Sequence, residues 1–374
     1  MPRYRLGSAI VLILSLALSL VLAEAVCRLM LPPPGFVPRG SDDIPGLWVE
    51  HPTRGYTYAR QFSGTIVRED FSIRVRTSGL GFRIDEESNR PIGSHHLVLT
   101  VGDSFTFGWG VEYEQAWPAQ LESILNEGRV SGSGPQVINA GVSGYSLRQI
   151  HRLTLDLIEE LNPEVVVVGV YPAAVDRLFD PYVLFKGGLV RSSSVPHLQA
   201  FRDGYLFSPM YRPWMMAVDF WLDEHWSFGS YVWKELYKLR ERMSGGKVPV
   251  PAAVVEKSRG AGGDTIRPLL DELDSIRVFV RAKHTRLMVL SIVGQDRDGT
   301  ISPSQRQSND RLLAWCRETG VECVEVLSAF DARAGGAPVF RFKNDLHWSP
   351  LAHRVAAEEM AKRFSHGALP VGSR

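Results

Sequence analysis

Short apolar runs alternate with helix-like segments over most of the chain beyond residue 90. The runs of strand length are Leu97–Val101, Val137–Ala140, Val165–Tyr171, Leu287–Val293 and Cys323–Val326. Apolar residues three or four positions apart predict helices over 112–127 and along the faces marked by Leu147/Ile150/Leu157/Leu161, Ile266/Leu269/Leu273/Ile276, Leu312/Leu313/Trp315 and Leu351/Val355/Met360/Phe364. This alternation predicts an α/β fold, a three-layer α/β/α sandwich around a mainly parallel, doubly wound sheet.

One segment interrupts this rhythm after the third predicted strand, at about residues 178–263. It is rich in aromatic residues and ends in a stretch of Gly, Pro and Lys; the aromatic residues are Trp214, Phe220, Trp221, Trp226, Phe228, Tyr231, Trp233 and Tyr237. An insertion at the strand ends is typical of a lid or a substrate wall. We favour a helical subdomain with an aromatic core, and the alternatives are a platform for sugar rings and a contact with the membrane surface.

The chain before residue 91 is predicted to lie outside this domain. Residues 1–31 form a membrane segment, residues 32–90 form a linker with a β-hairpin extension, and residues 91–368 form the α/β domain. The linker prediction covers Pro32–Pro52, which is rich in Pro, Gly and Asp. Two alternating runs within Gly64–Arg76, separated by Glu69 and Asp70, predict the hairpin.

The amino-terminal segment has the length and composition of a membrane span. Leu6–Ala23 contains no charged residue, Arg3 and Arg5 precede it, and Pro32–Pro34 ends the helix. The basic flank predicts a cytoplasmic amino terminus, so the main domain would be periplasmic or extracellular. We favour an uncleaved signal anchor; the alternative is a signal peptide cleaved near Ala23–Ala25.

The composition gives no sign of nucleic-acid binding. The 42 basic and 41 acidic residues leave a net charge of +1, and the chain contains no long run of basic residues. Cys27, Cys316 and Cys323 fit neither a zinc site nor a disulfide framework. Cys316 and Cys323 could lie near each other across a helix–strand junction, but we expect two unrelated thiols. We predict no metal site and no cofactor.

The segment Val101–Gly110, with the sequence VGDSFTFGWG, places Ser104 where a strand ends and a turn begins. Ligands bind beyond the carboxyl ends of the strands in open parallel sheets, and a serine there can act as a nucleophile. The alternative is a Gly-Asp-Ser turn in which Asp103 or Ser104 caps a helix.

A general base for Ser104 is available near the other end of the chain. His347 and Asp345 lie in the loop NDLHWSP before the final helix, and we expect this loop to follow the last strand to the same edge as Ser104. A carboxylate holds a catalytic histidine in the tautomer that the reaction needs. Gly141 follows the second strand, and its N–H is predicted to join that of Ser104 in an oxyanion hole. His353 lies within the helix and is predicted to face away.

Together these motifs resemble those of the SGNH (GDSL-type) hydrolase superfamily, over about Leu97 to Phe364. The resemblance implies that Ser104 is the nucleophile, that Gly141 is the glycine of the second motif, and that Asp345 and His347 complete the triad. The family often has its Asp three residues before the His, where this chain has Asn344.

The chain departs from the family in the third motif. By position, Ala173 stands where the family has an asparagine that donates to the oxyanion. Losing one such donor typically costs about 100- to 1000-fold in rate. Asn139, Ser143 and Tyr145 are the candidates to replace it.

Two functions follow from these motifs. The resemblance implies a serine esterase, acyl hydrolase or O-acyltransferase anchored in the membrane, and a substrate that is an ester, most simply an acetyl ester, of a cell-surface glycan. The alternative is a non-catalytic module of the same fold that binds a glycan or an assembly partner, which the loss of the asparagine at Ala173 favours. Retention of Ser104, His347 and Asp345 favours the enzyme.

Overall fold

Five parallel strands form one side of an eight-stranded sheet, and their order places the carboxyl end of β6 at a crossover. The parallel strands are β6 (Leu97–Gly102), β7 (Gln136–Gly141), β8 (Val165–Val170), β13 (Arg286–Ser291) and β14 (Glu322–Glu325). The full order is β14-β13-β8-β6-β7-β5-β4-β3. The chain runs outward from β6 in one direction to β7 and then returns to β8 on the other side. Ligands bind in the crevice at such a switch point.

The computed structural model describes residues 2–30, 44–85, 92–93, 96–129, 134–179, 181–185, 188–191, 198–202, 206–209, 221–222, 225–229, 231–232, 266–334 and 339–366. Outside the main sheet, the described strands are β1 (Trp48–His51), β2 (Gly55–Tyr58), β9 (Tyr182–Phe185), β10 (Gly188–Arg191), β11 (Leu198–Arg202) and β12 (Leu206–Pro209).

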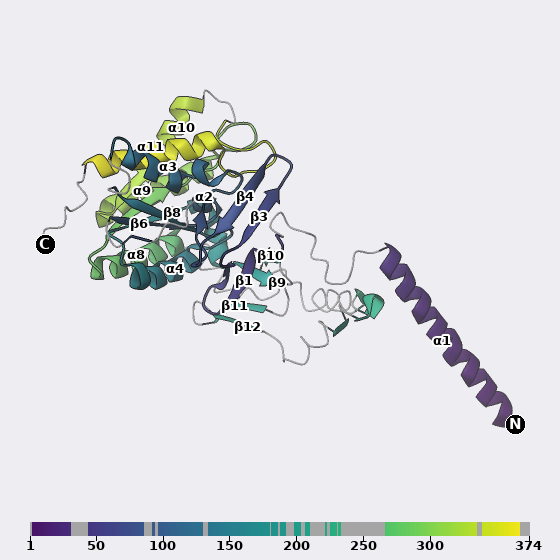
Figure 1. Ribbon diagram of the computed structural model, residues 1–374. Helices are drawn as coiled ribbons and strands as arrows, with labels where there is room; N and C mark the ends of the chain where they lie inside the picture. Colours follow the sequence, from purple (N-terminus) through teal and green to yellow (C-terminus); the bar gives the residue numbers. More distant parts are fainter. Residues whose placement is uncertain are drawn as a thin grey trace.

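Helices cover both faces of the sheet, which confirms the predicted three-layer α/β/α fold. On one face lie α4 (Leu147–Leu161), α8 (Arg267–Ala282) and α9 (Pro303–Thr319); on the other lie α3 (Trp117–Asn126), α10 (Leu327–Ala334) and α11 (Pro350–His366). Figure 1 shows α4 and α8 side by side below the sheet, and α3 and α11 above it.

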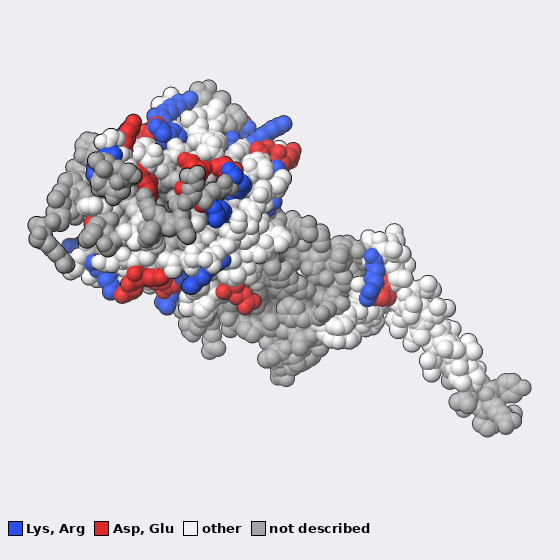
Figure 2. Space-filling view, viewed as in Figure 1, with Lys and Arg blue, Asp and Glu red and all other residues white. Residues whose placement is uncertain are grey.

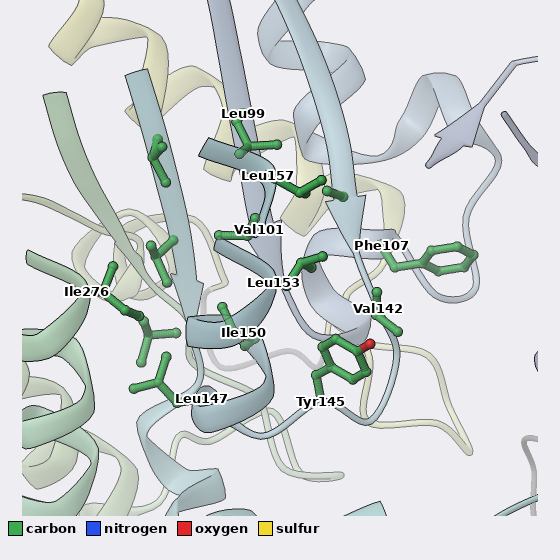
Figure 3. Packing of buried hydrophobic residues seen from close by; sticks show 14 of the residues in the cluster. Leu99, Val101, Phe107, Val142, Tyr145, Leu147, Ile150, Leu153, Leu157 and Ile276 are labelled. Atoms are coloured by element: carbon green, nitrogen blue, oxygen red, sulfur yellow. The ribbon is translucent and has the colours of Figure 1, made fainter. Parts of the chain in front are cut away.

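The sequence of α4 explains both its start and its packing. Ser146 and Gln149 form a capping box, in which each side chain bonds the backbone N–H of the other residue. One apolar stripe then points at the sheet, where it packs against Leu99 and Val101 of β6 (Figure 3). The stripe consists of Leu147, Ile150, Leu153 and Leu157. This layer supports β6 directly behind Ser104.

Three antiparallel strands continue the main sheet beyond β7. They are β3 (Ser63–Val67), β4 (Ser72–Thr77) and β5 (Arg83–Ile84). β3 and β4 form the predicted hairpin, and Arg83 of β5 pairs with Asn139 of β7. The extension is therefore bonded to the edge of the α/β sheet.

Two boundaries differ from the sequence analysis. Residues 48–51, which we expected in the linker, form β1, because Trp48 is buried against Tyr56 and Tyr58 of β2. The helix expected over 112–127 is divided into the 3-10 helix η1 (Tyr113–Gln115) and α3. Ala116 between them is extended, and Pro118 can only occupy the first turn of a helix because it lacks an N–H.

Cys316 and Cys323 are joined in a disulfide, so our expectation of two unrelated thiols was wrong. α9 ends at Thr319 and β14 begins at Glu322, and this tight connection brings the two Cα atoms to 6.1 Å. Such bonds persist in oxidising compartments such as the periplasm and the cell exterior.

Helix α1 (Pro2–Met30) contains one stretch, Ile10–Met30, that is long and apolar enough to cross a membrane. None of the apolar window in this stretch is buried against the rest of the protein. In Figure 2, coloured charged side chains lie at the end of α1 nearest the rest of the molecule, where Glu24 pairs with Arg28.

The insertion contains strands as well as helical turns. β9 pairs with β10 and β11 pairs with β12, both antiparallel, so the prediction of a helical subdomain is wrong for these residues. β9 and β10 contain the aromatic and β-branched residues Tyr182, Val183 and Val190, which favour strands. Trp214, Phe220, Trp233 and Tyr237 lie outside the described residues.

The buried His353 of α11 is expected to lower the stability of the fold as the pH is lowered. It is fully buried, its Nδ1 accepts a hydrogen bond from the Trp117 N–H at 3.3 Å, and burial lowers its pKa to about 3. The unfolded chain protonates this residue near pH 6.5 but the folded chain does not, so stability present above pH 6.5 is lost as pH falls toward 3. From pH 7 to 5 this amounts to about 2 kcal/mol.

Urea unfolding of the detergent-solubilised protein at pH 7 and pH 5 tests this expectation. His353→Gln keeps an acceptor but does not titrate, so its stability should fall by about 2 kcal/mol less than that of the wild type over this interval. The exposed His284→Gln is the control. An equal pH dependence for His353→Gln and the wild type would contradict the account.

Candidate active site

Ser104 is the first residue of the short helix α2 (Ser104–Phe107), directly after β6. Gly102 is required at the end of the strand, because a Cβ there would lie 2.0 Å from Thr106 Oγ1. Asp103 caps the helix by accepting the Phe105 N–H at 3.0 Å, so it takes the capping role that we offered as the alternative for this turn. This role leaves the Ser104 hydroxyl free to face other elements.

Ser104, His347 and Asp345 form a continuous hydrogen-bonded chain. Ser104 Oγ lies 2.7 Å from His347 Nε2, and His347 Nδ1 lies 2.5 Å from Asp345 Oδ1. Asp345 Oδ1 also accepts the backbone N–H of His347 at 2.8 Å. With Nδ1–H donating to the carboxylate, Nε2 is left as the acceptor for the serine hydroxyl. The structure thus brings together three side chains that are up to 243 residues apart.

Asp345 is held in its charged form. Burial on its own opposes ionisation, but the hydrogen bonds from His347 and the indole of Trp109 lower the pKa of this carboxyl below its usual value. A carboxylate at this position stabilises the positive charge that the imidazole gains when it takes a proton.

The loop that carries His347 is fixed by the exit of β13. Trp348 is buried and its indole N–H donates to the Val293 carbonyl at 2.7 Å, while the Gln295 side chain accepts the Phe340 N–H at 2.9 Å. We expected this loop directly after the last strand, but α10 intervenes between β14 and the loop. The backbone of Val293 and the side chain of Gln295, both just after β13, therefore hold the loop that carries His347.

A buried ion pair links the exits of β6 and β8. Asp103 Oδ2 accepts from Arg177 Nη1 at 2.9 Å, and both side chains are largely buried. Arg177 lies in the 3-10 helix η2 (Pro172–Leu178). Although burial opposes its charge, Asp103 and other neighbours raise the pKa of Arg177. The pair ties the turn that holds Ser104 to the segment after β8, and sequence reasoning missed it because the partners are 74 residues apart.

Ala173 lies on η2 and is exposed, so the position that the family resemblance assigns to an oxyanion donor has none. Two of the three candidate replacements are already bonded. Asn139 Nδ2 donates to the Phe107 carbonyl at 3.2 Å, and the Tyr145 hydroxyl donates to the Tyr56 carbonyl at 2.5 Å. These bonds occupy the Tyr145 hydroxyl proton and one of the two amide hydrogens of Asn139.

Gly141 has a packing role at the end of β7. Its N–H donates to Asn139 Oδ1 at 3.1 Å, and its role in an oxyanion hole stays a prediction. A Cβ at this position would lie 2.3 Å from the backbone nitrogen of Phe107. Glycine is therefore needed here so that α2 can pack closely on the end of β7.

Ser143 is the candidate that we favour, because its hydroxyl accepts a bond and keeps its own proton. It is buried in the loop after β7, and its Oγ accepts from the Tyr58 hydroxyl at 2.8 Å, which leaves its own proton for another acceptor. Its neighbour Val142 donates its N–H to the Gly102 carbonyl at 2.9 Å. This bond places the loop beside the turn that carries Ser104.

The tip of the β3–β4 hairpin contacts the histidine loop. Asp70 accepts the backbone N–H of Asn344 at 2.6 Å and its side-chain amide at 3.1 Å. Phe71 packs against Phe342 and Trp109, with ring centroids 5.2 and 6.4 Å apart. Asn344 thus faces the hairpin, and Asp345 alone of the two neighbours contacts His347. The sequence separation of 274 residues gave no signal for this contact.

Removing the Asp70 side chain is expected to lower turnover about tenfold with little change in overall stability. Asp70→Ala deletes both bonds to Asn344 and loosens the loop that aims His347, and a factor of ten corresponds to about 1.4 kcal/mol in the barrier. Steady-state kinetics on a small acetyl ester measures the change. Glu69→Ala, at an exposed position on the same turn, is the matched control. Equal kcat values for the two variants would show that the hairpin does not position the loop.

Among the described residues, no group of three or more His, Cys, Asp or Glu side chains is placed to hold a metal ion.

Comparison with known proteins gives matches among solved structures. No family model and no curated protein sequence matches the chain. The chain is similar to solved structures of G-D-S-L lipolytic proteins and esterases. A member of the lipolytic protein G-D-S-L family from Veillonella parvula is 11% identical over 72% of this chain and 99% of its own, with a TM-score of 0.40. A catalytic mutant of Axe2, an acetylxylan esterase from Geobacillus stearothermophilus, is 15% identical over 76% and 100%, with a TM-score of 0.41. TesA is 16% identical over 72% and 98%, with a TM-score of 0.40.

Proposed function

We propose that this protein is a serine ester hydrolase of the SGNH (GDSL-type) superfamily. The observation that carries the proposal is the hydrogen-bonded chain from Asp345 through His347 to Ser104, at the switch point of a doubly wound sheet. Nucleophile, base and orienting carboxylate lie at the contact distances that acyl transfer needs.

The geometry supports a two-step mechanism. Ser104 Oγ attacks the ester carbonyl as its proton passes to His347 Nε2, and Asp345 stabilises the resulting imidazolium. The tetrahedral intermediate collapses, His347 returns the proton to the departing alkoxide, and an acyl-serine remains. Water, or a sugar hydroxyl in the transferase variant of this proposal, then attacks the acyl group as its proton passes to His347. The bond to Ser104 Oγ breaks, His347 returns the proton to this oxygen, and the carboxylic acid or the acylated sugar departs.

For the oxyanion we propose the backbone N–H of Ser104 and the hydroxyl of Ser143. The Ser143 hydroxyl is oriented by the bond that its oxygen accepts from Tyr58. It lies in the loop whose Val142 N–H bonds the carbonyl of Gly102, and Gly102 is close in the chain to Ser104. A hydroxyl donor here would compensate for the missing asparagine at Ala173.

Ser143→Ala is expected to lower kcat by about 100-fold, with a smaller effect on KM, because the hydroxyl would bind the charge that develops in the transition state. Tyr58→Phe is the matched control, because it removes the bond to Ser143 Oγ but keeps the Ser143 hydroxyl. Steady-state kinetics measures kcat and KM for both variants. A decrease no larger in Ser143→Ala than in Tyr58→Phe would assign Ser143 a structural role.

For localisation and substrate we propose an extracytoplasmic domain, held by α1, that acts on an ester of a cell-surface glycan. The apolar length of α1 supports the anchor, and the disulfide between Cys316 and Cys323 supports an oxidising compartment. The acetyl group and the glycan acceptor follow from the resemblance of the sequence motifs to membrane-anchored members of the superfamily.

Labelling with a fluorophosphonate tests the proposed function directly, because only an activated serine reacts rapidly. The wild-type protein should be labelled on Ser104, and Ser104→Ala should not be labelled. Mass spectrometry of the labelled peptide identifies the site.

The competing function is a binding module without catalysis, which the exposed Ala173 favours. That function predicts no fluorophosphonate label and no ester turnover, together with retained binding of an acetylated polysaccharide. Labelling of Ser104 would exclude it.

A further inference from the structure

Residues 225–228 of the insertion are bonded to the carboxyl-terminal part of α1. Glu24 of α1 accepts the backbone N–H groups of Ser227 and Phe228 at 3.0 and 2.7 Å. Arg28, one turn further, pairs with Glu24 at 2.6 Å and donates to the His225 carbonyl at 3.3 Å. Figure 1 shows these short teal helical pieces beside the end of α1 that leads into the rest of the chain.

The position of Glu24 along α1 fixes the level of this contact. At 1.5 Å per residue, Leu6 and Glu24 are separated by ~27 Å, close to the ~30 Å thickness of the hydrocarbon core of a bilayer. The uncharged stretch Leu6–Ala23 is long enough to cross this core by itself, so we take the span to end near Glu24 and the last turns of Ile10–Met30 to lie beyond it. The charged side chain of Glu24 then reaches the polar headgroups. Residues bonded to Glu24 then lie at the same level as these headgroups.

The side chains of this segment suit that level. Trp221 and Tyr231 are 55% and 48% exposed, although most large apolar side chains of the α/β domain are buried. Trp221 stacks on His225, with ring centroids 5.2 Å apart and planes at 10°. Tryptophan and tyrosine concentrate at membrane interfaces, because one part of each ring is apolar and the other forms hydrogen bonds.

We propose that the described residues 221–222, 225–229 and 231–232 lie on the outer surface of the bilayer, with Trp221 and Tyr231 among the lipid headgroups. The inference rests on the proposed membrane anchoring by α1 and adds a second contact with the same membrane. The bonds from Glu24 and Arg28 hold the segment against the end of the span. Two contacts in place of one limit the rotation of the attached domain about α1.

Depth-dependent fluorescence quenching tests this proposal in the full-length protein. Trp221→Cys, Leu14→Cys and Val278→Cys are each made in a Cys27→Ser background and labelled with an environment-sensitive fluorophore. Leu14 reports on the span, and the exposed Val278 of α8 is the control on the α/β domain. The proteins are reconstituted into phosphatidylcholine vesicles with and without lipids that carry a nitroxide near the headgroup or deep in the acyl chain.

We expect the headgroup nitroxide to reduce fluorescence at position 221 about twofold, the deep nitroxide to quench position 14, and neither to affect position 278. Adding Glu24→Ala should weaken the quenching at 221 and leave that at 14 unchanged. Quenching at 14 without quenching at 221 would overturn this inference alone. Absence of quenching at 14 would overturn the membrane anchor and, with it, the inference.

Discussion

Replacing Ser104 with alanine is expected to lower kcat on a small acetyl ester by at least about 1000-fold, which corresponds to roughly 4 kcal/mol of transition-state stabilisation. The side-chain oxygen that lies 2.7 Å from His347 Nε2 is the atom that would form the acyl-enzyme bond. Alanine removes only this oxygen from a buried position, so the strand, the cap by Asp103 and the core behind it should persist. Hydrolysis of p-nitrophenyl acetate by the detergent-solubilised protein measures the loss.

A matched change separates loss of the nucleophile from general damage. Ser275→Ala alters an exposed serine on α8 and should retain wild-type kcat. Circular dichroism and thermal unfolding should be the same for both variants. Retention of more than about a tenth of the wild-type kcat in Ser104→Ala would refute a covalent mechanism at this residue.

The second large effect is expected for Asp345→Asn, with kcat lower by about 1000- to 10,000-fold. The carboxamide has nearly the shape of the carboxylate but carries no charge. It can present an N–H to His347 Nδ1, which favours the tautomer whose Nε2 carries a proton and cannot accept the one on Ser104. The low pKa of Asp345 indicates that the wild-type group is ionised when the enzyme works.

The neighbouring Asn344 offers a sharper version of this experiment. The family resemblance places an Asp at that position, yet in the structure Asn344 lies against Asp70. We therefore expect that moving the carboxylate, in Asp345→Asn/Asn344→Asp, will not restore activity, because the new charge would meet Asp70 and would not reach His347. Recovery of kcat in the double variant would show that the loop rearranges and that Asp345 is not uniquely placed.

The central sheet could be predicted from the sequence because each of its strands and helices has a recognisable pattern of apolar residues within its own segment. A strand buried on both faces, such as Val165–Val170, is a continuous apolar run, and a helix such as α4 repeats its apolar residues every three or four positions. The order of these elements then leaves few possible topologies. The three side chains of the proposed triad followed from the same logic, because each was expected at the carboxyl edge of the sheet.

The contacts that position the site could not be predicted in the same way. The Asp103–Arg177 pair, the bond from Trp348 to Val293 and the contact between Asp70 and Asn344 each join segments far apart in the chain. No periodicity encodes such pairs. Gly141 shows the same limit on a smaller scale: its place at a strand end did not predict its close packing on Phe107.

The pairing of β5 with β7 has a practical consequence for any shortened form of this protein. A chain that starts at residue 91 would lack β3, β4 and β5, and would uncover the backbone N–H and C=O groups along one border of the sheet. Unpaired edge strands of this kind pair with strands of other molecules, and the protein then aggregates. Such a chain would also lose Arg83, whose guanidinium donates to the carbonyls of Phe107, Gly108 and Val111 just after Ser104. Expression for crystallisation should therefore begin no later than Ile44, where the described fold resumes after α1.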